Sequence, residues 1–154
     1  MDKRYYFEDI SIPDEPSCLI LLDLDGTLMP DIPGDTSIES AVKEKVAQFS
    51  QHHSVYICTN GKNHDRARKI ASELGISFVD SRYKKHNKKI LNDIPLDPNR
   101  QTIVIGDKIL TDGLLARRLD AHFYLIKRKK SGKESLFVRL VEYLDDAIAA
   151  LISL

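Results

Sequence analysis

The sequence has few cysteines and no long apolar run, and these absences exclude several classes of protein. Its 154 residues contain two cysteines, Cys18 and Cys58, each inside an apolar run, so we expect reduced core thiols and a cytoplasmic protein rather than a disulfide framework. The longest apolar runs, such as 19–22, are far shorter than the roughly 20 residues that cross a bilayer. The first residues, 1–5, show no apolar stretch of signal-peptide length.

Net charge is also lacking, because 23 basic and 23 acidic side chains cancel. The balance argues against disorder driven by charge and against a protein that coats nucleic acid. The charges are nevertheless unevenly placed, since residues 1–40 hold ten acids and two bases. Two dense basic segments follow, at 82–89 and 127–133. Such segments are either a solvated rim or a surface that attracts an anionic substrate or membrane.

Apolar runs and helical periodicity alternate along the chain. Strand-length runs occur at 19–22, 55–58, 76–79, 102–105 and 123–126, and helical spacing occurs at 39–51, 63–74, 85–94, 111–119 and 136 to about 151. This alternation predicts an α/β fold, a three-layer Rossmann-like parallel sheet with helices on both faces. We expect one domain over 1–154, with an N-terminal extension at 1–16 and a C-terminal helix at 134–153.

Polar residues stand where the predicted strands end, which is where ligands bind in such sheets. Asp23 and Asp25 follow the first run, and residues two apart in an extended segment share a face. Two such carboxylates repel unless a cation or a shared proton lies between them. The alternative is a strand that ends in an ordinary turn.

A second acidic group, Asp107 and Asp112, follows the fourth run. If that strand neighbours the first, Asp107 lies beside Asp23, and gathered carboxylates favour Mg²⁺. Helix capping is the alternative role for Asp107 and Asp112. Thr59 and Asn60 end the second run, where a hydroxyl and an amide could hold a phosphate oxygen or simply form a turn.

A phosphoryl group near several aspartates also requires a positive charge. Four nearby lysines are candidates for this positive charge: Lys84, Lys85, Lys88 and Lys89. The residues alone do not choose among them.

Four stretches together resemble the motifs of the haloacid dehalogenase (HAD) superfamily. They are Asp23-Leu24-Asp25-Gly26-Thr27, Thr59-Asn60, the basic segment near Lys85, and Gly106-Asp107 with Asp112 five residues later. The resemblance implies a phosphatase in which Asp23 is the nucleophile that forms an aspartyl-phosphate and Asp25 is the general acid and base. It further implies Mg²⁺ held by Asp23, Asp107 and the backbone carbonyl of Asp25.

The remaining roles follow from the same resemblance. Asp112 would bind metal-bound water or orient the lysine, Thr59 and Asn60 would hold the phosphate, and Lys85 would neutralise developing charge. The gaps between the motifs are too short for a cap domain. The segment 104–112 resembles the YqeG-type branch, which includes phosphatidylglycerophosphate phosphatases, although Lys108 stands where that branch usually has Gln.

These features lead to one main hypothesis and two alternatives. The main hypothesis is a Mg²⁺-dependent phosphomonoesterase with an open site, suited to a large or lipid-linked phosphate. The alternatives are a phosphatase of a small sugar phosphate or nucleotide whose site is closed by an oligomer neighbour, and a non-catalytic HAD-shaped binding protein. Apolar residues at helical spacing near the C-terminus, from Leu136 to Leu151, either dock on the sheet or contact an anionic membrane.

Overall fold

The computed structural model describes residues 4–152 and contains a five-stranded sheet in which every neighbouring pair is parallel. The strands are β1 (Leu19–Leu22), β2 (Ser54–Ile57), β3 (Ser77–Phe78), β4 (Thr102–Gly106) and β5 (His122–Leu125). Their order across the sheet is β3-β2-β1-β4-β5. The order reverses at β1, so the predicted Rossmann-like α/β fold is confirmed, and β1 and β4 meet at the switch point where ligands bind.

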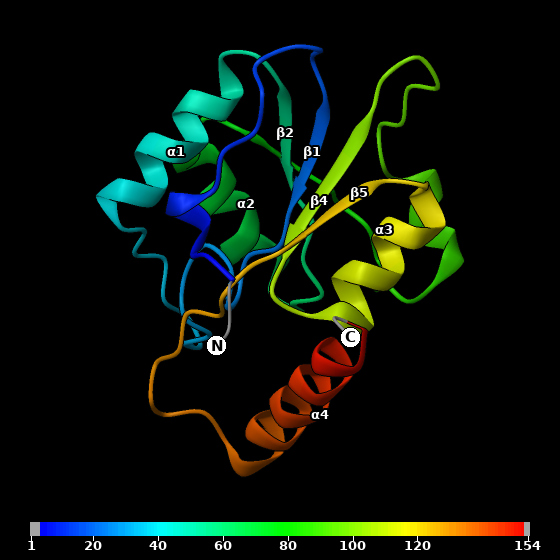
Figure 1. Cartoon of the computed structure of the whole chain (residues 1–154). Helices are drawn as coiled ribbons and strands as arrows, with labels where there is room; N and C mark the ends of the chain where they lie inside the picture. Colours follow the sequence, from blue (N-terminus) through cyan, green and yellow to red (C-terminus); the bar gives the residue numbers. More distant parts are fainter. Residues whose placement is uncertain (1–3, 153–154) are drawn as a thin grey trace.

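Helices cover both faces of the sheet, as Figure 1 shows. The α-helices are α1 (Ser40–Ser50), α2 (His64–Leu74), α3 (Leu114–Leu119) and α4 (Leu136–Ile152), with short 3₁₀ helices η1 (Phe7–Asp9) and η2 (Lys88–Asn92) and a π-helical turn η3 (Ile109–Gly113). The core on one face joins α1 and α2 to the sheet, and the core on the other joins α3 and η2 to it. Side chains of β1 alternate between these cores, which explains why the strand is apolar throughout.

The segment 4–16, the described part of the predicted N-terminal extension, packs onto the first of these cores. Phe7 is fully buried, and its ring lies 5.8 Å from that of Phe49 on α1. Ile10 and Ile12 are buried beside it. The extension therefore forms part of the hydrophobic core.

Asn63 and Gly75 set the start and the end of α2. The side chain of Asn63 accepts a hydrogen bond from the Arg66 N–H at 3.0 Å and caps the first turn. Gly75 ends the helix with φ of +67°, a left-handed conformation that costs glycine little.

The helix predicted over 85–94 is wrong in most of its length, because only η2 forms there. The N–H of Lys85 donates to the Asn60 side chain at 2.8 Å, and the Asn87 side chain accepts from the Lys89 N–H at 3.0 Å. The Lys89 N–H is a donor that a regular helix beginning at Lys85 would use, so its bond to Asn87 replaces a helical hydrogen bond. The helix predicted over 111–119 is confirmed only from Leu114, since the residues before it form η3.

The C-terminal helix is confirmed as α4, with Ser153 of the predicted range lying outside the described residues. Its apolar stripe does not dock on the sheet, because Leu136, Leu140, Leu144 and Leu151 are all more than half exposed. The buried side of α4 carries Glu142, Asp145 and Ala149 instead. Within 4–152, no helix has the length and apolar character needed to cross a membrane.

Candidate functional site

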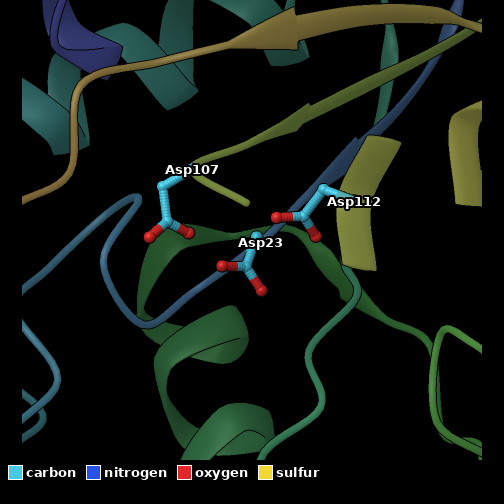
Figure 2. Close-up of side chains that lie close together, drawn as sticks. All are labelled: Asp23, Asp107 and Asp112. Carbon is cyan, nitrogen blue, oxygen red and sulfur yellow. The ribbon is translucent and has the colours of Figure 1, made fainter. Parts of the chain in front are cut away.

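Three aspartates from separate segments meet at the carboxyl end of the sheet. Asp23 follows β1, Asp107 follows β4, and Asp112 lies in η3, and one oxygen from each lies within 4.8 Å of the others. Figure 2 shows the three carboxyl groups turned toward one another. The pairing of Leu22 with Ile105 brings the ends of β1 and β4 side by side, so the predicted meeting of Asp23 and Asp107 is confirmed.

Two glycines allow the acids to come this close. A Cβ on Gly106 would overlap the Asp112 carboxyl group, so only glycine leaves room for that side chain beside β4. Gly26 has φ of +88°, and a Cβ there would lie 2.5 Å from an Asp107 oxygen. The turn after β1 therefore requires glycine both for its backbone conformation and for the approach of Asp107.

Lys85 is the lysine that enters the acidic cluster. Its Nζ lies 2.5 Å from Asp23 Oδ1 and 2.5 Å from Asp112 Oδ1, and the side chain is 2% exposed. The side chains of Lys84 and Lys88 are exposed on the surface. Arg118 on α3 donates to the carbonyl of Lys85 at 3.4 Å and so helps to hold this loop against the site.

The other edge of the cluster is closed by a hydroxyl and a guanidinium. The Thr27 hydroxyl lies 3.3 Å from Asp23 Oδ2 and 3.3 Å from Asp107 Oδ1. It therefore bridges two carboxylate oxygens that Lys85 does not contact. Arg128 donates to Asp107 Oδ2 and also pairs with Glu142 on α4 at 2.9 Å. Three carboxylates therefore share two cations, and one of these cations also serves Glu142.

Burial and mutual repulsion shift the protonation of the three acids in different directions. Burial and the neighbouring Asp23 carboxylate raise the pKa of Asp107 to about 6 and that of Asp112 to about 7. Burial also opposes ionisation of Asp23, but the adjacent Lys85 ammonium outweighs it and lowers the pKa of that carboxyl. The cluster holds more negative charge than its bases neutralise when all three acids are ionised.

That excess charge and the donor set both fit a hard divalent cation. Mg²⁺ binds oxygen ligands and commonly uses one or two carboxylates together with water and phosphate. Asp23 Oδ2 and Asp107 Oδ1, the oxygens linked through Thr27, are not contacted by Lys85 or Arg128. The buried aspartate cluster could therefore hold a metal ion.

Asp25 lies beside the cluster but belongs to a different ion pair. Arg66 on α2 contacts both of its oxygens, at 3.2 and 2.9 Å. Burial raises the pKa of the Asp25 carboxyl above its ordinary value, although the Arg66 guanidinium lowers it in part. The guanidinium fixes the direction of this carboxyl group, because a two-bond contact allows little rotation.

Thr59 and Asn60 follow β2 at the same edge of the sheet. Thr59 Oγ1 accepts from the Gly61 N–H at 3.1 Å, which is a local turn. A Cβ built on Gly61 would lie 3.8 Å from Asp25 Oδ2, so this turn is next to Asp25. The Asn60 side chain accepts a hydrogen bond from the Lys85 N–H, so this amide connects the turn after β2 to the loop that carries Lys85.

Sequence reasoning missed Thr27, Arg66 and Arg128 as members of the site. Thr27 stood inside the first motif and could have been found from it. The two arginines come from α2 and from the segment after β5, far along the chain from the acids they contact. No spacing rule connects residues at such separations, although the basic segment 127–133, which the sequence analysis singled out, contains Arg128.

Comparison of the sequence with known protein families, with curated proteins and with solved structures finds no match.

Proposed function

We propose that this protein is a Mg²⁺-dependent phosphomonoesterase of the haloacid dehalogenase type that works through an aspartyl-phosphate on Asp23. One observation supports the proposal above all others: three buried carboxylates gather around a buried lysine at the carboxyl end of a parallel sheet. A structural ion pair needs one acid for one base, whereas this cluster holds an excess of acid. Mutually repelling buried carboxylates are costly for stability, and such groups gather where a cation or a reaction requires them.

Asp23, Asp107 and the Asp25 backbone carbonyl would hold the metal in this proposal, and Asp112 would bind water on it or orient Lys85. When bound, Mg²⁺ offsets the negative charge of the cluster and of the phosphate, so that two anions can approach each other. The contact of Asp112 with Lys85 at 2.5 Å favours the orienting role.

The first chemical step assigns the nucleophile to Asp23. A carboxylate oxygen of Asp23 attacks phosphorus, the bond between phosphorus and the ester oxygen breaks, and the leaving oxygen takes a proton from Asp25. The low pKa of Asp23 keeps that carboxyl ionised as a nucleophile requires, and the raised pKa of Asp25 favours the protonated form that a general acid requires.

The second step reverses the role of Asp25. Asp25 removes a proton from water, the water oxygen attacks phosphorus, and the bond to Asp23 breaks to release inorganic phosphate. Thr59 and Asn60 would hold the phosphate oxygens during both steps, and Lys85 would neutralise the charge that develops on them.

The substrate that we propose is a large or lipid-linked phosphomonoester, such as phosphatidylglycerophosphate. The stretch between Asp25 and β2 contains α1, and the stretch between Thr59 and Lys85 contains α2 and β3. These elements belong to the sheet layers, so in the described chain neither stretch adds a domain over the site. An open site suits a leaving group that stays outside it.

The decisive test is phosphate release from an aryl phosphate in the presence of Mg²⁺ by the wild type and by Asp23→Asn. We expect the variant to lose activity by at least about 10³-fold, because the amide is not a nucleophile. Asp9→Asn is the matched control, since Asp9 is an exposed acid on η1 and lies outside the cluster. Circular dichroism would show that both variants keep the fold.

Undiminished activity in Asp23→Asn would overturn the mechanism. A wild type without activity on aryl, sugar, nucleotide or lipid phosphates, and without thermal stabilisation by Mg²⁺ and beryllofluoride, would favour the non-catalytic alternative. In the same panel, preference for the lipid phosphate over sugar phosphates and nucleotides would support the large substrate.

A further inference from the structure

The helix α4 packs against the molecule through the side that carries two of its acids. The Asp145 carboxylate accepts the N–H groups of Ile109 and Leu110, both at 3.0 Å, and Glu142 pairs with Arg128. Asp145 and Glu142 are both buried. An ordinary surface helix buries its large apolar side chains, whereas α4 buries two acids among smaller or half-buried apolar residues and leaves its largest apolar side chains in solvent.

The opposite side of α4 presents large apolar side chains to solvent. The members of this outer face, which are 51% to 83% exposed, are Leu136, Phe137, Leu140, Tyr143, Leu144, Leu151 and Ile152. An apolar hollow of about 530 Å³ adjoins the C-terminal end of the helix, between Ile152, Leu110 and Phe123. Ile152 belongs both to the outer face and to the lining of this hollow, so the two meet at the C-terminal end of α4. Several large apolar side chains exposed together mark an interaction site.

Basic side chains stand at the N-terminal part of this face. Lys133 and Arg139 are exposed there, as is Lys130, which lies 3.8 Å from a Glu142 oxygen. On α4, Asp146 is the exposed acid, and it pairs with Arg4 at 3.0 Å. An apolar face with a basic margin has the composition of a helix that lies in the plane of a membrane surface.

We propose that the outer face of α4 docks on an anionic lipid bilayer. The apolar side chains enter the boundary between headgroups and acyl chains, Tyr143 lies at the headgroup level, and the basic margin contacts anionic headgroups. Seventeen residues with charges among them are too few to cross the bilayer, so the helix lies on its surface.

A second copy of the chain is a weaker candidate for the same face. In a two-fold dimer the same patch meets itself, so the basic margin must face α4 of the partner. The outer face offers it no free carboxylate, because the described acids of α4 are Glu142, Asp145 and Asp146, and all three are already engaged. Anionic headgroups supply the missing negative charge.

The docked orientation would bring the acidic cluster close to the lipid headgroups. Figure 1 shows α4 beyond the end of the sheet to which β1 and β4 lead. Through Glu142 and Arg128, α4 is connected to Asp107 itself. The docking surface does not depend on the proposed phosphatase function, because its residues are not those of the cluster.

The absence of tryptophan from the chain permits a direct test. Phe137→Trp places a single tryptophan on the outer face, and Leu96→Trp places one at an exposed apolar position before β4 as the control. We add vesicles of phosphatidylcholine alone or with about a third phosphatidylglycerol, at low salt. We expect a blue shift for Phe137→Trp on the anionic vesicles, with quenching by brominated lipid, and none for Leu96→Trp.

Co-sedimentation of the wild type and of further variants gives a second measurement. We expect Leu140→Asp with Leu144→Asp to weaken binding to the anionic vesicles by about tenfold or more, and Leu96→Asp to leave it unchanged. Lys133→Gln with Arg139→Gln should also weaken binding, whereas Lys69→Gln with Lys88→Gln, which removes equal charge on α2 and η2, should weaken it less.

Three results would overturn the proposal. They are the absence of a fluorescence shift for Phe137→Trp, equal binding to neutral and anionic vesicles, and a dimer in light scattering that Leu140→Asp converts to a monomer. The last result would assign the face to a second copy. None of these measurements uses phosphatase activity, so their failure is distinct from failure of the proposed reaction.

Discussion

At the scale of single residues, Lys85 determines which oxygens of the cluster remain available. It contacts Asp23 and Asp112 on one side, and Arg128 contacts the far oxygen of Asp107. Burial of an ammonium costs free energy that only close carboxylates offset. These two acids do so, because they hold the pKa of Lys85 above its ordinary value although burial alone would lower it. The lysine is therefore charged at neutral pH, and the edge near Thr27 is left for a further cation.

Arg66 is expected to set the pH at which Asp25 exchanges its proton. The guanidinium favours the ionised carboxyl, so Arg66→Gln should raise the pKa of Asp25 further. In the proposed reaction, the limb of the pH profile of kcat that belongs to Asp25 should move to higher pH. Measurement of kcat from about pH 4 to about pH 9 would test this shift.

Arg68→Gln is the matched control for that profile. Arg68 lies on the same helix, but it is exposed and pairs with Asp65 and Asp80. Its removal should leave the profile where it is. A profile of Arg66→Gln that is identical to that of the wild type would show that Asp25 is not the group that titrates in the reaction.

Part of the site could be predicted from residues alone because strand ends are local signals. Asp23 and Asp107 each follow a buried apolar run, and adjacency of the two strands in a parallel sheet was enough to bring them together. Lys85 could not be chosen among its neighbours by any physical rule in the sequence, and only the family resemblance selected it. Arg66 could not be found, since its contact with Asp25 depends on the position of α2 beside the sheet.

At the scale of secondary-structure elements, η3 and α4 depend on each other. The N–H groups of Ile109 and Leu110 open the turn, where no earlier helical carbonyl can accept them. Asp145 reaches these two donors from α4, and the Asp112 side chain accepts the Lys108 N–H at 3.2 Å. One acid of the cluster and one acid of α4 thus hold the same turn in place.

Replacement of Asp145 by alanine should destabilise the protein strongly for this reason. The variant leaves two backbone donors without their acceptor at a part-buried position, and we expect a loss of roughly 2–4 kcal/mol in the free energy of unfolding. Urea denaturation of Asp145→Ala would measure it. Asp146→Ala is the control, because its pair with Arg4 lies at the surface and should contribute less than about 1 kcal/mol. Equal losses in the two variants would contradict the proposed role of Asp145.

Elements with strong periodicity were predictable, whereas those that depend on side-chain bonds to the backbone were not. The segments that form α1 and α2 repeat apolar residues at helical spacing, and both helices formed. The segment 85–94 has similar spacing, but the Asn87 side chain accepts from the Lys89 N–H, a donor that a regular helix would use. The length of α4 was also predictable. Its orientation was not, because hydrophobicity alone favours a buried stripe, whereas Glu142 and Asp145 are the side chains that bond to the rest of the molecule.

At the scale of the whole molecule, the uneven charge of the sequence becomes a set of long-range pairs. Acids from the first 40 residues pair with bases from later segments, as Asp23 does with Lys85, Asp25 with Arg66, and Glu8 with Lys129. The fold therefore uses the acidic N-terminal part and the basic remainder to join segments at the carboxyl end of the sheet.

The stability of the whole protein should consequently respond to pH and Mg²⁺ together. The pKa values of Asp107 and Asp112 in the folded state, about 6 and about 7, lie above the ordinary value of 3.8. The folded state then holds more protons than the unfolded state between about pH 4 and about pH 7, so these acids contribute less stability as pH rises through that range. The lowered pKa of Asp23 acts in the opposite sense, but only at and below about pH 4.

Mg²⁺ binds the ionised carboxylates and competes with their protons, so its stabilising effect should increase with pH. We expect the rise in Tm on addition of Mg²⁺ to be small near pH 5 and large near pH 8, where a concentration about 100-fold above Kd adds about 2.7 kcal/mol. The comparison with and without Mg²⁺ at each pH cancels the contribution of His53, whose burial lowers its pKa. Asp107→Asn should abolish the rise in Tm on addition of Mg²⁺ at both pH values. A rise in Tm that is equal at the two pH values, or one that survives in Asp107→Asn, would place the cation elsewhere than between Asp23 and Asp107.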